Sequence, residues 1–151
     1  MQTQAPPPPK TMMKDPKYGA AEEIMALAPA RLAALLRDSQ ATVYAKAKAC
    51  QQLAITGGRE AVAALEPLLS DARLSHYARF ALEPNTDPSA AAALRKALGT
   101  LKGPLLIGVV NSLGVRRDRG AIETLAKMVY SEDAALARAA NAALARIRPP
   151  A

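Results

Sequence analysis

One short segment of the sequence gathers side chains that could bind a ligand or transfer protons. It contains His76, Tyr77, Arg79 and Glu83. Spacings of three and four residues place His76, Arg79 and Glu83 on one face of a helix. Catalysis is not predicted, because His76 has no serine and carboxylate in a recognisable triad and no paired carboxylates face an apolar wall. We therefore interpret the segment as a recognition surface in a protein that is not an enzyme.

The wider set of candidate binding residues also includes residues from an earlier helix, from a later helix and from the basic turn that follows it. The candidates are Lys48, Gln51, His76, Tyr77, Arg79, Asn111, Arg116 and Arg117. A structural interpretation competes with the functional one: Arg79 would pair with Glu83 inside its own helix, and Asn111 would bond a neighbouring turn. The sequence leaves both interpretations open.

Metal and thiol chemistry are not expected. Cys50 is the only cysteine and His76 the only histidine, so no cluster can supply three or four metal ligands. Cys50 lies among small residues of a predicted helix, which favours a buried apolar role over a reactive thiol. We predict no metal and no cofactor.

The elements that position these side chains follow from a repeated leucine. The recurring positions are Leu53, Leu82, Leu113 and Leu144, at intervals of 29, 31 and 31 residues. A second series precedes them at Leu32, Leu65, Leu94 and Leu125. A period of this size is typical of stacked repeats, and two interleaved series indicate two helices in each repeat.

Composition favours an all-α protein. Alanine accounts for 35 of the 151 residues, aromatic residues make up only 3%, and no useful length alternates with period two. Residues 1–16, which include four consecutive prolines, are predicted to be a disordered arm, and residues 17–148 a single repeat domain. No apolar core of a signal peptide is present. A native start at Met1 would predict a cytoplasmic protein, and a secreted or periplasmic origin stays open.

The predicted helices form four pairs behind a capping helix over residues 17–28. The pairs are 29–37 with 42–55, 60–69 with 72 or 75–83, 88–101 with 104–115, and 120–130 with 132–147. Gly57 and Gly58 are expected to end their helix in the left-handed conformation. Asp87 is expected to cap a helix whose first residue is Pro88.

The two-helix unit resembles HEAT repeats, in particular the short bacterial HEAT-like type also found in phycobilin-lyase-related proteins. The likeness covers about residues 29–148. Its matching positions are Leu65, Leu68 and Leu69 in a first helix, the turn acids Asp38, Asp71 and Asp133, and Ala140, Ala143, Leu144 and Ile147 in a second helix. The third repeat departs from the pattern, because Lys102, Gly103 and Pro104 stand where the others have an acid.

The resemblance implies a right-handed α-solenoid of about four repeats, with a concave surface lined by second helices and used for protein binding. The leading hypothesis is thus a non-enzymatic interaction scaffold with an unidentified protein partner and no membrane, either by itself or as part of a larger chain or complex. The net charge of +7 supports an alternative, a basic nucleic-acid-binding module, although no block of five basic residues occurs. A third hypothesis, an accessory subunit for cofactor or chromophore attachment, rests on fold analogy alone.

Overall fold

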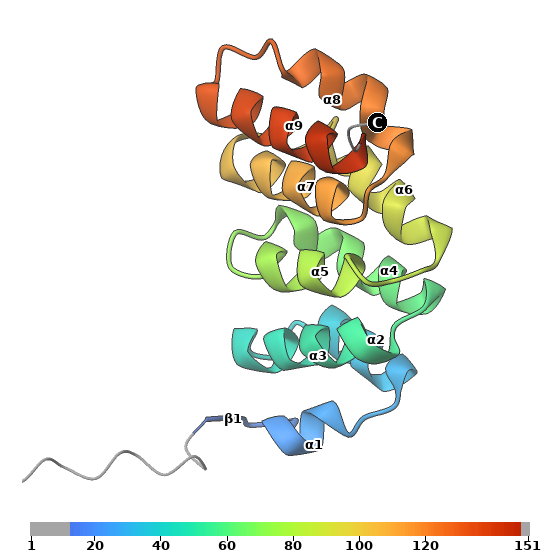
Figure 1. Ribbon diagram of the computed structural model, residues 1–151. Helices are drawn as coiled ribbons and strands as arrows, with labels where there is room; N and C mark the ends of the chain where they lie inside the picture. Colours follow the sequence, from blue (N-terminus) through green and yellow to red (C-terminus); the bar gives the residue numbers. More distant parts are fainter. Residues whose placement is uncertain (1–12, 149–151) are drawn as a thin grey trace, which may run out of the picture.

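The computed structural model describes residues 13–148, and these residues are mainly helical, as the sequence predicts (Figure 1). The predicted disordered arm falls largely on residues 1–12, which lie outside the described part. At its other end the prediction differs from the structure. Residues 14–20 form a small antiparallel hairpin of strands β1 (Lys14–Asp15) and β2 (Gly19–Ala20), and helix α1 (Ala21–Met25) begins four residues later than expected.

Four helix pairs follow α1. They are α2 (Pro29–Arg37) with α3 (Val43–Thr56), α4 (Arg59–Leu65) with α5 (Ser75–Leu82), α6 (Pro88–Ala97) with α7 (Gly103–Val115), and α8 (Ile122–Met128) with α9 (Ala134–Ile147). The 3-10 helix η2 (Glu66–Ser70) continues α4, and η3 (Arg119–Ala121) precedes α8. The change at η2 follows from Pro67, which has no N–H to give to an α-helical ladder.

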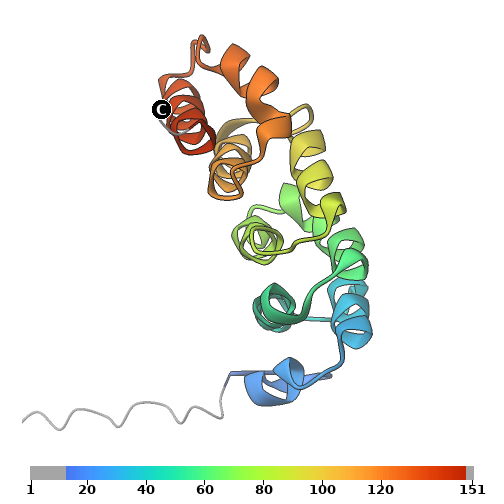
Figure 2. The ribbon, with the colours of Figure 1, turned by 45° about the vertical axis from the view of Figure 1, so that its right-hand side comes forward.

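The pairs stack in two layers. The first helices α2, α4, α6 and α8 lie on one side, and the second helices α3, α5, α7 and α9 on the other (Figures 1 and 2). Contacts run from α3 to α5, from α5 to α7 and from α7 to α9, whereas in the other layer α2 contacts α4 and α4 contacts α6. The stack bends so that the second helices occupy the inner side of the bend (Figure 2).

Both leucine series lie in the core. Leu32, Leu65, Leu94 and Leu125 of the first helices are fully buried, and so are Leu53, Leu82 and Leu113 of the second helices. Leu144 is only partly buried, because α9 ends the stack and no later repeat covers it within the described residues. The periodic leucines therefore report the packing register of each helix correctly.

The helix ends agree with the sequence in some places and not in others. Asp87 caps α6 as predicted, accepting a hydrogen bond from the Ser89 amide. The left-handed conformation predicted for Gly57 and Gly58 is wrong, because their φ angles are −67° and −141°. Gly57 is required by close packing instead, since a Cβ there would lie 2.4 Å from the Leu53 carbonyl oxygen.

Candidate protein-binding face

Each second helix turns one stripe of side chains toward solvent. Gln51, Phe80, Asn111 and Ala142 occupy equivalent positions of α3, α5, α7 and α9, each two residues before the repeated leucine. Residues one or two turns before or after them extend the stripe. We call this set the second-helix face and define it as Tyr44, Lys48, Gln51, Ile55, Tyr77, Phe80, Asn111, Val115, Ala142 and Arg146.

Three large apolar side chains stand out on the second-helix face. Ile55 is 76% exposed, Phe80 52% and Val115 47%. Sequence reasoning did not single out these three residues, although each lies two positions from a repeated leucine and thus away from the buried side of its helix. Exposed large apolar groups that line up from helix to helix are a common mark of an interaction surface.

Five of the sequence candidates lie on or beside this face, and four of them, Lys48, Gln51, His76 and Tyr77, belong to α3 and α5. The Lys48 ammonium donates to Gln51 Oε1 over 3.2 Å and lies 5.8 Å from the centre of the Tyr44 ring. The rings of His76 and Tyr77 meet edge to face with their centres 5.8 Å apart. His76 is exposed and Tyr77 half-buried, so this part of α5 presents aromatic rings to solvent.

The Arg79 side chain lies between α5 and α7 and does not belong to the second-helix face. Its Nη1 donates to the Gly108 carbonyl oxygen over 3.0 Å and to Ser112 Oγ over 3.3 Å. The Ser112 hydroxyl donates in turn to Glu83 Oε1 over 2.9 Å, so Arg79 and Glu83 are joined through α7. Burial lowers the pKa of Arg79 from its usual value, and the Glu83 carboxylate opposes that shift. Arg79 therefore joins two repeats.

Arg116 has a similar role at the end of α5. Its Nη1 donates to three carbonyl oxygens, over 2.6 Å to Leu82, 3.1 Å to Glu83 and 2.6 Å to Asn85. The last carbonyls of a helix have no partner within the helix and carry partial negative charge, so a cation is favourable there. Burial lowers the pKa of Arg116. The fold thus accounts for Arg79 and Arg116 through contacts inside the protein.

The two remaining candidates are exposed. Asn111 borders a shallow depression between α7 and α9 together with Val115, Ala142 and Arg146. The bond predicted from Asn111 to a neighbouring turn is not seen among the described residues. Arg117 follows Arg116 with a φ of 53°, a conformation that non-glycine residues rarely adopt.

The N-terminal hairpin supplies contacts that the sequence did not reveal. Asp15 is buried, and its carboxylate accepts hydrogen bonds from the amide and hydroxyl groups of Thr42, the residue that caps α3. Its other oxygen accepts from the amides of Lys17 and Tyr18. Burial alone would raise the pKa of Asp15, but these hydrogen bonds outweigh burial and lower it to about 2.

Asp38, in the turn between α2 and α3, pairs with the Lys17 ammonium over 2.7 Å and accepts from the Tyr18 hydroxyl. The hairpin is thus bonded to both ends of the turn between α2 and α3. The sequence did not predict the hairpin, because strands of two residues are too short to show an alternating pattern and no glycine-rich dipeptide marks the turn.

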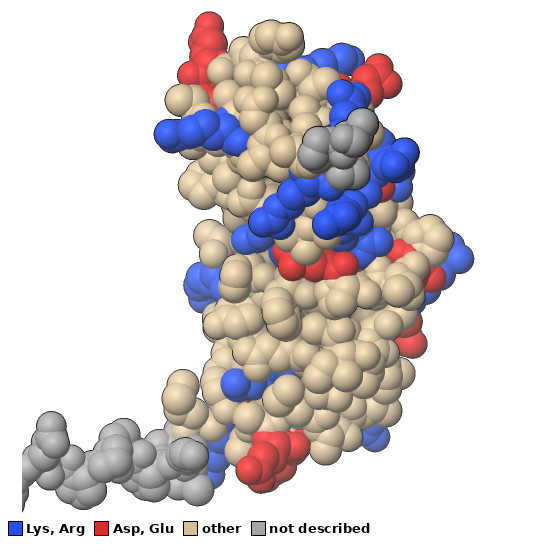
Figure 3. Space-filling model, viewed as in Figure 1, with Lys and Arg blue, Asp and Glu red and all other residues tan. Residues whose placement is uncertain are grey.

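The positive charge is not spread evenly over the molecule. In Figure 3, lysine and arginine side chains gather toward the end of the stack that holds α7, α8 and α9. Arg119, Lys127 and Arg148 line one depression there, and Glu123 is the only acidic group among the residues that line it.

Within residues 13–148, no three histidine, cysteine, aspartate or glutamate side chains are placed to hold a metal ion. None of the helices in this part of the chain has the length and apolarity needed to cross a bilayer. Burial raises the pKa of the Cys50 thiol to about 12. No protein-family model and no curated protein matches the chain.

Proposed function

We propose that the chain is a non-catalytic, HEAT-like interaction module, a right-handed α-solenoid whose second-helix face binds a protein partner. The observation that carries this proposal is the exposure of Ile55, Phe80 and Val115, one on each of three successive second helices. The layer of second helices lies on the inner side of the bend (Figure 2). Ile55 and Val115 occupy the same position, two residues after the repeated leucine, and Phe80 lies about one turn earlier on α5. Each of three successive second helices therefore exposes one large apolar group, and aromatic side chains dominate the energy of many protein interfaces.

The chemistry of the face also supports a partner of a particular kind. Its charged members, Lys48 and Arg146, are both cations, and the second-helix face as defined contains no acid. A protein segment that presents apolar side chains next to carboxylates would match it. Polar groups such as Gln51 and Asn111 supply donors and acceptors between the apolar contacts.

Nucleic-acid binding is the alternative, and the contacts inside the fold reduce its support. Arg79 and Arg116 donate to groups of the protein itself, so two of the cations that could have met phosphates are already occupied. The accessory-subunit hypothesis stays a prediction, because it rests on analogy alone.

Site-specific photo-crosslinking tests the proposal. A photoreactive residue at position 80, in extracts of the native host, should give a discrete crosslinked protein, and the same residue at position 34 should not. Ala34 is a matched control, because it is an exposed residue on the first helix α2. The change Val115→Asp should remove the crosslink by placing a repelling, hydrated charge on the face.

Two outcomes would contradict the proposal. Identical crosslinks from positions 80 and 34 would show that the second-helix face is not selective. Binding of a DNA duplex at about 50 mM salt that is lost at about 200 mM, with no effect of Val115→Asp, would favour the nucleic-acid alternative.

A further inference from the structure

The face of α8 that points away from α6, here called the outer face of α8, consists of positions whose equivalents on α4 are covered by the next first helix, α6. Residue by residue, α8 lies 60 positions after α4, because Leu65 and Leu125 are equivalent leucines. On α4 and η2, two depressions along the junction with α6 are lined by Arg59, Val62, Ala63, Glu66, Leu69 and Ser70. On η3 and α8, one depression is lined by Arg119, Ile122, Glu123, Ala126 and Tyr130, which are equivalent to five of these six.

The two sets differ in what covers them. Val62 is buried at 3% exposure, because α6 packs against α4. The equivalent Ile122 is only partly buried, and Val129 is partly buried where the equivalent Leu69 is buried. Among the described residues, no helix lies against α8 in the way that α6 lies against α4. The end of the stack therefore presents a helix-receiving surface with its apolar residues in place.

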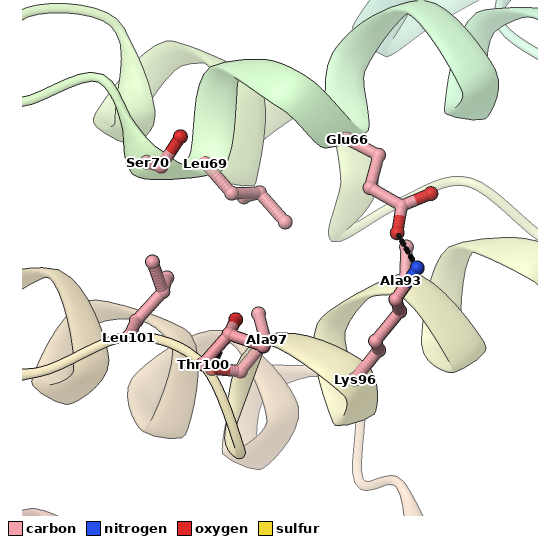
Figure 4. Close-up of a pocket in the computed structure, with 8 residues that line it drawn as sticks. All are labelled: Glu66, Leu69, Ser70, Ala93, Lys96, Ala97, Thr100 and Leu101. Atoms are coloured by element: carbon pink, nitrogen blue, oxygen red, sulfur yellow. Dashed lines mark hydrogen bonds and ion pairs between the residues drawn. The ribbon is translucent and has the colours of Figure 1, made fainter.

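The ion pairs between successive first helices indicate which charges a helix on this surface would carry. At the α4–α6 junction, Glu66 meets Lys96 over 3.7 Å, as Figure 4 shows. At the next junction, Arg95 occupies the position equivalent to Glu66 and pairs with Asp118 over 2.8 Å. Each of these two junctions thus has an ion pair that starts from the same position of the first helix.

On α8 the equivalent position holds Ala126, and the charges around it are cationic. Arg119, Lys127 and Arg148 line the depression, all three exposed, with Glu123 as the only acid. A helix that completed the pattern would bring carboxylates to the positions where α6 brings Lys96. We propose that the outer face of α8 docks an acidic amphipathic helix of a partner protein, which packs there as α6 packs on α4.

A peptide derived from α6 provides the probe, because α6 is the helix that the equivalent face of α4 receives. The probe spans residues 87–101 with the changes Arg95→Glu and Lys96→Glu, and its control carries the unchanged sequence. Fluorescence anisotropy at low salt should show at least tenfold tighter binding of the acidic peptide to the full chain. Equal binding of the two peptides would overturn the proposal.

Variants of the full chain locate the site. Lys127→Glu should weaken binding of the acidic peptide at least fivefold, and Tyr130→Ala should weaken it about as much. Both residues are exposed, so neither change should disturb folding. Lys102→Glu, which makes the same charge change in the exposed turn between α6 and α7, should alter binding less than twofold. Equal effects of Lys127→Glu and Lys102→Glu would mean binding through net charge, which would also overturn it.

Sedimentation velocity separates this partner from a second copy of the chain. The chain should stay monomeric at the concentrations used for anisotropy. Self-association that Lys127→Glu abolishes would show that another copy fills the α8 face, and the acidic-helix proposal would fail. The proposal concerns the end of the stack, so its outcome is independent of crosslinking at Phe80.

Discussion

Asn85 and Arg116 occupy the same position of successive repeats, three residues after Leu82 and Leu113, and both reach back to the preceding turn. Asn85 Nδ2 donates to the Gly58 carbonyl oxygen over 3.1 Å, and Arg116 Nη1 donates to the Asn85 carbonyl oxygen over 2.6 Å. The two residues therefore join three successive inter-repeat turns into one line of hydrogen bonds.

The change Arg116→Ala tests this line directly. It removes a charged donor and leaves the carbonyls of Leu82 and Asn85 without that partner, so we expect the free energy of unfolding to fall by roughly 2–3 kcal/mol. Urea unfolding followed by circular dichroism measures the loss. Arg117→Ala is the matched control, because Arg117 is exposed, and it should change stability by less than about 0.5 kcal/mol. Equal effects of both changes would show that the contacts of Arg116 are not stabilising.

The repeated leucines should differ in their contribution according to their burial. Leu82 is fully buried between repeats, so Leu82→Ala should cost roughly 2–5 kcal/mol by opening a cavity. Leu144 occupies the equivalent position but is partly exposed at the end of the stack, so Leu144→Ala should cost clearly less. Thermal or urea unfolding compares the two variants. A larger loss for Leu144→Ala would mean that α9 is better covered in solution than in the described structure.

The hairpin should make stability depend on pH in the acid range. The pKa of Asp15 is lowered from 3.8 to about 2, so its contribution is present above pH 4 and is lost as the pH falls toward 2. Asp15→Asn should remove a contribution on the order of 1–2 kcal/mol at pH 7. Below pH 2, where Asp15 is protonated in both states, the variant and the wild type should differ much less. Urea unfolding at pH 7, 4 and 2 measures the difference, and a constant gap at all three values would refute the role of this carboxylate.

Cys50 should be chemically silent while the protein is folded. Its thiol is buried, and its pKa is raised to about 12, so almost no thiolate forms at pH 8. Labelling with a maleimide or a disulfide reagent should be slow in buffer and fast in a denaturant. Rapid labelling of the folded chain would show that α3 opens locally, since the thiolate has to reach the reagent.

The mainly helical fold and the buried side of each helix were predictable from the sequence, whereas the polar contacts between helices were not. Leu65, Leu94 and the other repeated leucines fix which side of each helix is buried, because helical periodicity is a local property. The sequence leaves Arg79 either in a recognition surface or paired with Glu83 in its own helix, but its hydrogen bonds go to Gly108 and Ser112, about 30 residues away. Hydrogen bonds between repeats depend on how one repeat is rotated relative to the next. The spacing of residues within one helix does not predict that rotation.

The exposed apolar groups were missed for a related reason. Ile55 and Phe80 look like ordinary core residues in a chain where half of the residues are hydrophobic. Their exposure can be inferred only after the buried side of each helix has been assigned from the repeated leucines. Their placement on the same side of the molecule can be inferred only after the helices have been stacked. The hairpin at Asp15 had no periodic pattern that could have revealed it.

The line of bonds from Gly58 through Asn85 to Arg116 has a mechanical consequence. It fixes the distances between turns along one edge of the stack, whereas the junction of α4 and α6 in the outer layer leaves depressions on both sides of Glu66 and Lys96. Compressing or opening those depressions costs less than breaking the bonds of the turns. We therefore expect the stack to bend about that edge. Its curvature could then adjust to a partner while the spacing between these three turns stays constant.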